Sequence, residues 1–85
     1  MDIKQQFDEA VSESKSLQEK PSNDTLLQLY SLYKQATEGN VNSGPPANPF
    51  DFVAKAKYEA WTNLKGKSKM EAMSEYIALV KKLKV

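Results

Sequence analysis

The sequence predicts an all-α fold of four helices in one domain that spans residues 1–85. The first observation is the placement of glycine and proline, the residues that interrupt helices most strongly. All of them fall at three places, Pro21, the segment 39–49 and Gly66, and these leave four uninterrupted segments. The second observation is that apolar side chains recur at helical spacing within the segments, which is typical of amphipathic helices.

The first two helices are expected on either side of Pro21. The apolar stripe of the first segment has helical spacing and consists of Ile3, Phe7, Ala10, Val11, Ser14 and Leu17. The second helix is expected to begin after Ser22, a favourable N-cap, with Asp24 in its first turn, and to end at Gly39. The short link around Pro21 favours antiparallel neighbours.

The third helix is expected to open at Asn48-Pro49-Phe50-Asp51, with Asn48 as the N-cap and Pro49 as its first residue, and to close at Gly66. The fourth opens with a capping box formed by Ser68 and Glu71. Its apolar stripe consists of Met73, Tyr76, Ile77, Val80 and Leu83. The short link at Gly66 again favours antiparallel neighbours, whereas the link 39–49 is long enough to cross the bundle and permits a parallel pair.

Cysteine, histidine and arginine are absent from the chain, and this narrows the chemistry that it can perform. A disulfide framework and a catalytic thiolate are excluded, and so is an imidazole base. A zinc site would lack its usual nitrogen and sulfur ligands. We therefore expect no enzymatic activity, no metal and no cofactor, and any bound anion must be held by lysine, hydroxyl or backbone N–H groups.

The net charge of +1 conceals an asymmetry between the two parts of the chain. Residues 1–50 carry four lysines against seven acids, and residues 51–85 carry eight lysines against four acids. A basic half can serve an anionic partner, although a solvated face is the commoner explanation. An isoelectric point near 7.9 and the lack of arginine argue against nucleic acid as that partner.

Neither a membrane span nor a secretory signal is apparent in the sequence. No apolar run approaches the ~18 residues of a transmembrane helix. The first residues also lack the apolar region of a signal peptide. We therefore expect a cytoplasmic protein with no stable membrane insertion.

The second helix is more apolar than one packing face requires. Its apolar residues cover an arc of roughly 220°, whereas a single contact face needs little more than ~100°. Leu27, Tyr30 and Lys34 line one edge of this arc and would suit a ligand that is part aliphatic, part aromatic and part anionic. The alternative is a central helix that touches two neighbours, and the pattern alone favours this alternative.

A lysine also falls within the apolar arc of the third helix. Lys57 lies between Leu64 and Trp61 when the residues are plotted at 100° per residue. A lysine rarely faces a core without a counter-charge, so a bound anion is one explanation. The commoner explanation is that its stem covers apolar surface while its ammonium group stays in water.

Two ordered blocks of sequence resemble a known family. The first block, YxxYKQAT followed by a glycine, runs from Tyr30 to Gly39, and the second, KAKxxAWxxLKGxS, runs from Lys55 to Ser68. Together with Ala72-Met73 and Tyr76-Ile77 they resemble the acyl-CoA-binding proteins, which are small four-helix carriers of long-chain acyl-CoA esters. The resemblance extends over almost the whole chain, from Phe7 to Leu83.

The resemblance implies an up-down-down-up four-helix bundle, with the long loop as the crossover between helices two and three. It also implies one acyl-CoA-binding domain that binds long-chain fatty acyl-CoA with high affinity. The implied role is that of an intracellular carrier and pool former for fatty acid metabolism. Such a protein is expected to be a monomer that meets acyl-CoA-using enzymes only transiently.

The resemblance further implies a set of ligand contacts. Tyr33 would flank the adenine, and Lys34 and Lys57 would meet the 3′-phosphate. The positions that would complete the head-group site are Tyr30, Lys15 and Tyr76, with Val11 beside the adenine; those that would line the acyl groove are Phe7, Leu26 and Leu27. The chain departs from the family pattern at Val53, Ala54 and Tyr58 and in the loop 44–50.

Two other classes of function are considered beside the carrier. A helical protein-interaction module without a CoA ligand would use the wide arc of the second helix to dock a partner helix. A weak nucleic-acid binder would use the basic half and would show steep salt dependence.

Overall fold

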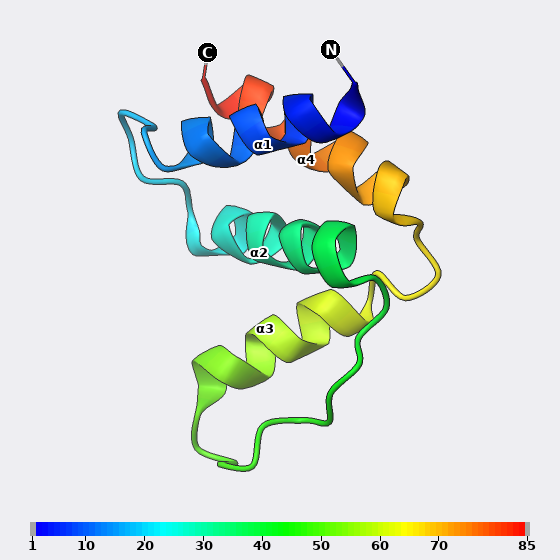
Figure 1. Ribbon diagram of the computed structural model, residues 1–85. Coiled ribbons are helices and arrows are strands. Elements are labelled where there is room, and N and C mark those ends of the chain that lie inside the picture. Colours follow the sequence, from blue (N-terminus) through cyan, green and yellow to red (C-terminus); the bar gives the residue numbers. More distant parts are fainter. Residues whose placement is uncertain (1, 85) are drawn as a thin grey trace.

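The computed structural model describes residues 2–84 and confirms the all-α fold (Figure 1). The helices are α1 (Ile3–Ser14), α2 (Asn23–Glu38), α3 (Phe52–Thr62) and α4 (Lys69–Leu83), and no strand occurs between residues 2 and 84. Helices α1 and α4 run in one direction, and α2 and α3 run in the other (Figure 1). The order is therefore up-down-down-up, because the loop between Glu38 and Phe52 returns the chain to the starting end of α2.

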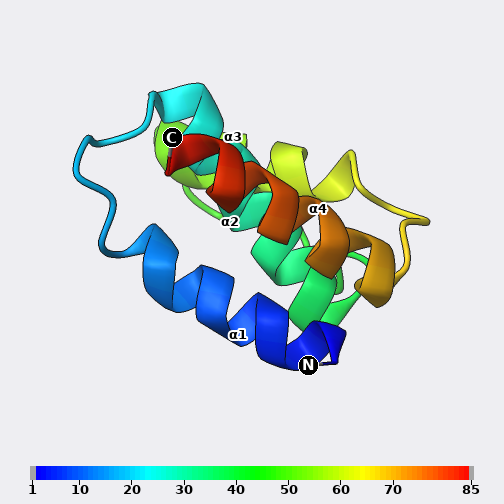
Figure 2. The same cartoon turned by 90° about the horizontal axis from the view of Figure 1, so that it is seen from above.

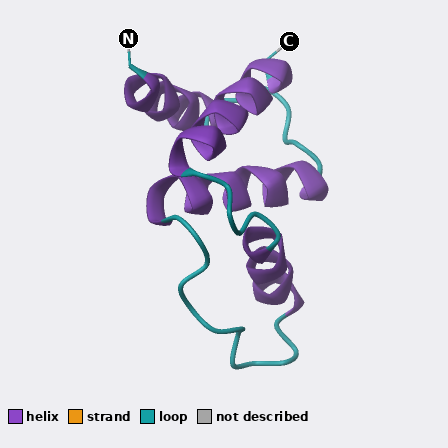
Figure 3. Ribbon diagram, turned by 90° about the vertical axis from the view of Figure 1, so that its right-hand side faces the viewer, coloured by secondary structure: helices purple, strands orange, loops and turns teal. Residues whose placement is uncertain are grey.

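Helix α2 lies between α3 and the pair formed by α1 and α4 (Figure 3). α4 packs against both α1 and α2 (Figure 2), whereas α3 packs against α2 alone. The helices joined at Pro21 and at Gly66 are antiparallel, as predicted, but their backbones are not in contact. α1 and α2 are still neighbours through their side chains, since Phe7 stacks on Tyr33. The predicted adjacency of α3 and α4 is wrong, because α2 separates them (Figure 3).

The predicted start signals of α2 and α4 are confirmed. The Ser22 side chain accepts the backbone N–H of Thr25, and Asp24 lies in the first turn of α2. Ser68 and Glu71 form the reciprocal capping box of α4. Gly39, with φ of 82°, ends α2 in a conformation that side chains with a Cβ rarely adopt.

Three predicted helix boundaries are wrong. α3 ends at Thr62, with Asn63 as its C-cap, rather than at Gly66. α3 begins at Phe52 with Asp51 as its N-cap, because the Asn48 side chain instead accepts the backbone N–H of Phe50 within a preceding turn. α1 ends at Ser14 rather than extending to Leu17. The hydroxyl of Ser14 donates to the carbonyl of Val11, and the next backbone N–H groups bond to carbonyls three residues back, which tightens and closes the last turn.

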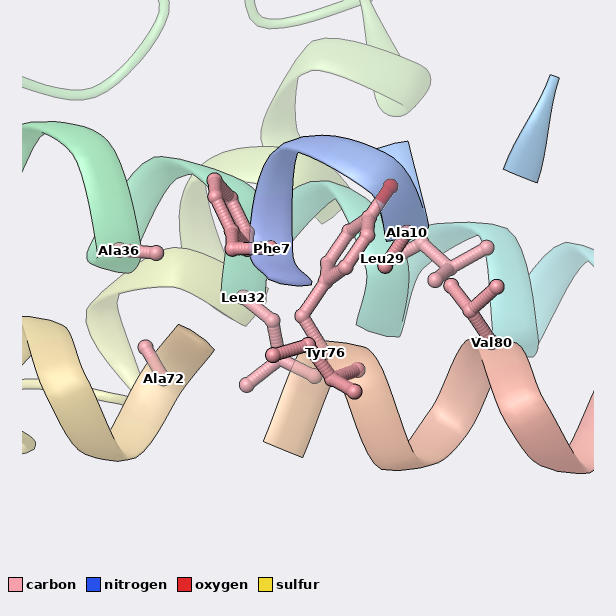
Figure 4. Packing of buried hydrophobic residues seen from close by; sticks show 9 residues of the cluster. Phe7, Ala10, Leu29, Leu32, Ala36, Ala72, Tyr76 and Val80 are labelled. Carbon is pink, nitrogen blue, oxygen red and sulfur yellow. The ribbon is translucent and has the colours of Figure 1, made fainter. Parts of the chain in front are cut away.

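The hydrophobic core is formed by α1, α2 and α4 (Figure 4). Its buried members are Phe7, Ala10, Leu29, Leu32, Ala36, Ala72, Tyr76, Ile77 and Val80. Within residues 2–84, α3 contributes one buried side chain, that of Trp61. Phe52 and Val53, at the start of α3, remain 71% and 66% exposed.

Candidate functional site

A hollow of about 340 Å³ lies where α1, α2 and α4 meet, and we call it the polar hollow because hydroxyl groups and a lysine take part in its lining. It brings together five of the residues that sequence predicts for ligand binding. The lining consists of Val11, Ser14, Lys15, Leu29, Tyr30, Tyr33 and Tyr76. Ser14 and Leu29 were not predicted as site residues. The sequence places Ser14 only in the stripe of the first helix, and the structure shows that it accepts a hydrogen bond from Tyr76.

Two of the tyrosines that line this hollow, Tyr33 and Tyr76, contact the ring of Phe7 behind them. Phe7 stacks on Tyr33 at a centroid distance of 6.0 Å and meets Tyr76 edge to face at 5.1 Å. Tyr33 is 40% exposed, so it retains surface on which a planar base can stack. Phe7 is only 3% exposed and lines neither this hollow nor the one between α2 and α3. It lies in the core beneath the two tyrosines, and its contact with an acyl chain stays a prediction.

Tyr76 is fixed at the base of the polar hollow. It is 4% exposed, and its hydroxyl donates to Ser14 Oγ at 3.0 Å. Burial raises the pKa of Tyr76 above its usual value, since the phenolate loses hydration there. The hydrogen bond to Ser14 partly opposes this shift.

The raised pKa of Tyr76 predicts a loss of stability at alkaline pH. A folded-state pKa above the unfolded value of about 10 means that the stability contribution is complete below about pH 10 and is lost as the pH rises through the folded-state value. Urea unfolding between about pH 8 and about pH 11 should therefore show a smaller alkaline decline for Tyr76→Phe than for the parent protein. Equal declines would contradict the prediction, because the two proteins differ only in the Tyr76 hydroxyl group.

An apolar hollow of about 390 Å³ lies between α2 and α3. Its lining consists of Asn23, Leu26, Leu27, Phe52, Val53, Ala56 and Lys57. Leu26 and Leu27, which the resemblance assigns to an acyl groove, both lie here. The surface of α3 that faces them, with Phe52, Val53 and Ala56, was not assigned from the sequence.

Lys57 connects the two hollows. Its stem lines the apolar hollow, and its ammonium nitrogen lies 5.2 Å from the ring centroid of Tyr30, which lines the polar hollow. Lys57 is exposed and forms no ion pair with any of residues 2–84. It is therefore a cation available at the junction of an apolar and an aromatic surface.

Lys34 reaches in the opposite direction, from α2 towards α3. Its ammonium nitrogen lies 5.0 Å from the centroid of the Trp61 ring and forms an ion pair with Glu38, one turn along α2. The hydrogen bond with Glu38 is the main cause that raises the pKa of Lys34, and in turn it lowers the pKa of the carboxyl group. Lys34 thus lines neither hollow in this arrangement, and its contact with a phosphate beside Lys57 stays a prediction.

The buried side-chain amide of Gln35 fixes the part of α2 that carries Lys34. Gln35 is fully buried, and its Nε2 donates to Asn40 Oδ1 at 3.0 Å and to the carbonyl of Lys67 at 2.7 Å. The indole N–H of Trp61 donates to the carbonyl of Gly39 at 2.9 Å. These bonds join the end of α2 to α3 and to the turn before α4, a role that helical spacing alone does not reveal.

Between residues 2 and 84, no helix has the length and hydropathy needed to cross a membrane. The same residues contain no cluster of three or more histidine, cysteine or acidic side chains arranged to hold a metal ion.

Known proteins resemble this chain in both sequence and structure. The family model described as "Acyl CoA binding protein" matches residues 4–80. The acyl-CoA-binding protein of Gossypium hirsutum is 48% identical over 83 residues, which cover 98% of this chain and 92% of that protein. The acyl-CoA-binding protein of Dictyostelium discoideum is 49% identical over 77 residues, which cover 91% of this chain and 90% of that protein.

Two crystal structures have the same fold. Acyl-CoA-binding protein 2 of Oryza sativa matches with a TM-score of 0.90 and 43% identity, covering 96% of this chain and 90% of that one. The corresponding protein of Moniliophthora perniciosa matches with a TM-score of 0.84 and 38% identity, covering 100% of this chain and 86% of that one.

Proposed function

The chain belongs to the acyl-CoA-binding protein family, and on that premise we propose that it binds long-chain fatty acyl-CoA esters with high affinity and acts as their intracellular carrier and pool former. The observation that carries this proposal is the connection of two unlike hollows through Lys57. A ligand that suits both hollows must be apolar at one end and aromatic and anionic at the other. An acyl chain joined to CoA has this composition.

The polar hollow supports a role in holding the nucleotide. The exposed surface of Tyr33 can stack on adenine, an interaction of roughly 1–3 kcal/mol by analogy with nucleic-acid bases. The Lys57 ammonium nitrogen lies 5.2 Å from the centroid of the Tyr30 ring, which supports a phosphate site formed by Lys57 and Tyr30 together. Lys15, which lines the same hollow at the end of α1, is a second cation available to the phosphates.

The apolar hollow supports a role in holding the acyl chain. Leu26 and Leu27 on α2 face Val53 on α3 across it. Each methylene group removed from water contributes ~0.8 kcal/mol, so a long chain can add as much binding free energy as the head group. Val53, which stands where many family members have a lysine, adds apolar surface here instead of a charge.

The proposal predicts an order of affinities that calorimetric titration can test. Palmitoyl-CoA should bind more tightly than either CoA or palmitate, because only the ester occupies both hollows. Dodecyl sulfate at the same concentration controls for non-specific binding of an anionic amphiphile. If palmitoyl-CoA bound no more tightly than CoA, the carrier function would be wrong.

The carrier role accounts for the wide apolar arc of α2. Leu29, Leu32 and Ala36 are buried in the core, as expected for a helix with two neighbours. The remaining edge of the arc lines the two hollows. A separate protein-interaction module is therefore not favoured, since no part of this arc is left to dock a partner helix.

The remaining parts of the proposal follow from the carrier role. The protein binds its ligand without converting it, works as a monomer in the cytoplasm, and meets acyl-CoA-using enzymes only while ligand is exchanged. The family is named for binding, which supports the first of these statements.

A further inference from the structure

The two lysines between α2 and α3 differ in their electrostatic surroundings. Lys57 extends from α3 to the ring of Tyr30, and no carboxylate among residues 2–84 pairs with it. Lys34 extends from α2 to the ring of Trp61, and Glu38 pairs with it. One cation is therefore free to meet an anion from outside the chain, and the other already has an anion from within it.

The pair of Lys34 and Glu38 lies close to the polar hollow. Lys34 follows Tyr33 directly in the sequence, and both Tyr30 and Tyr33 contribute to the electrostatic environment of its ammonium group. Lys34 also lies one turn beyond Tyr30 on the same edge of α2. A different rotamer of its side chain would direct the charge towards the hollow instead of towards Glu38.

The position of Glu38 favours its ion pair with Lys34. It is the last residue of α2, and the side chain of Asn42 in the following loop adds to the lowering of its pKa. The carbonyl of the next residue, Gly39, accepts the indole N–H of Trp61 at 2.9 Å, which ties the end of α2 to α3. Glu38 is therefore ionised at neutral pH and positioned by a braced helix end.

We propose that Glu38 competes with the 3′-phosphate of the ligand for the ammonium group of Lys34. Glu38 thereby sets how strongly this chain discriminates CoA from ligands that lack that phosphate. The inference rests on the proposed function. Lys34 must leave Glu38, or share its charge with it, before it can contact a phosphate. Glu38 also repels a dianion bound nearby, so both effects weaken the binding of a phosphorylated ligand.

The expected effect is moderate because the pair is partly exposed. The side chains of Lys34 and Glu38 are 25% and 40% exposed, so solvent screens their attraction. Glu38→Gln should tighten palmitoyl-CoA binding by about three- to tenfold at low ionic strength, from the lost competition and the lost repulsion together. The 3′-dephospho form of palmitoyl-CoA should change by less than about twofold, because it lacks the group that Lys34 would hold.

The chain offers a matched control. Glu75 also forms an exposed ion pair with a lysine, Lys67, and neither residue lines either hollow. Glu75→Gln removes the same charge from the protein without touching the site. It should leave the affinity for both ligands unchanged, and its thermal unfolding serves as the reference for Glu38→Gln.

Calorimetry on five proteins decides the matter: the parent, Glu38→Gln, Glu75→Gln, Lys34→Ala, and the double variant of Lys34→Ala with Glu38→Gln. The gain from Glu38→Gln should disappear when Lys34 is absent. An unchanged affinity in Glu38→Gln, equal gains for both ligands, or a gain that persists without Lys34 would each overturn the proposal. A parent protein that binds neither ligand would instead reject the carrier function.

Discussion

Replacing Lys57 by alanine is expected to weaken palmitoyl-CoA binding by about 1.5–3 kcal/mol, the usual contribution of a hydrogen bond to a charged group. Lys57 is the unpaired cation that adjoins both hollows, so its loss removes a phosphate contact and the apolar cover of its stem. Isothermal titration calorimetry of the two proteins measures the difference directly. The fold should remain intact, since Lys57 is exposed and buries no charge.

Lys55→Ala is the matched control for this experiment. Lys55 is also an exposed lysine of α3, two residues before Lys57, but it lines neither hollow. The two variants therefore lose the same charge from the same helix. A weakening confined to Lys57→Ala assigns the effect to the site, whereas equal changes would mean that only the general charge of α3 matters, and no change would remove Lys57 from the site.

Replacing Phe7 by alanine is expected to lower the free energy of unfolding by about 3–5 kcal/mol, the range for truncating a buried phenylalanine. Its ring contacts both Tyr33 and Tyr76, so the cavity would open between the core and the polar hollow. A domain of this size has only about 5–10 kcal/mol of stability in total, so the variant should be close to unfolding at room temperature. Urea unfolding followed by circular dichroism provides the measurement.

Phe50→Ala separates burial from the loss of an aromatic ring. Phe50 is 79% exposed in the loop before α3, and the same truncation there should change stability by less than about 0.5 kcal/mol. If Phe7→Ala were as stable as Phe50→Ala, Phe7 would not be a core residue. The milder variant Phe7→Leu, which keeps most of the buried volume, should remain folded and allow ligand binding to be measured.

The helices were predictable because their signals are local. Ser22 and Ser68 each cap the backbone N–H three residues along, and Gly39 ends α2 with a positive φ, so each boundary depends on a few adjacent residues. The start of α3 was less predictable because two capping side chains compete within four residues. Asp51 caps the helix while Asn48 bonds to the preceding turn, and the spacing alone does not decide between them.

The candidate site was predictable in its membership but not in its geometry. Family resemblance identified Tyr30, Tyr33 and Tyr76, which the fold brings to one hollow. It did not reveal that Phe7 lies beneath two of these rings, since a phenylalanine at helical spacing suits a core and a ligand groove equally. The pairing of Lys34 with Glu38 could be inferred from their four-residue separation. Only the structure shows that the paired Lys34 lies over the ring of Trp61.

α3 is attached to one neighbouring helix, so its resistance to local unfolding differs from that of the other three helices. α1, α2 and α4 share one core, whereas α3 packs against α2 alone and buries only Trp61 among its described side chains. Opening of α3 therefore requires less free energy than opening of the three-helix core. An acyl chain lying between α2 and α3 would add a second attachment, so the loaded protein gains its extra stability in this helix. Binding of the acyl chain and the local stability of α3 are therefore thermodynamically linked. The ligand-free protein is the form most exposed to proteolysis.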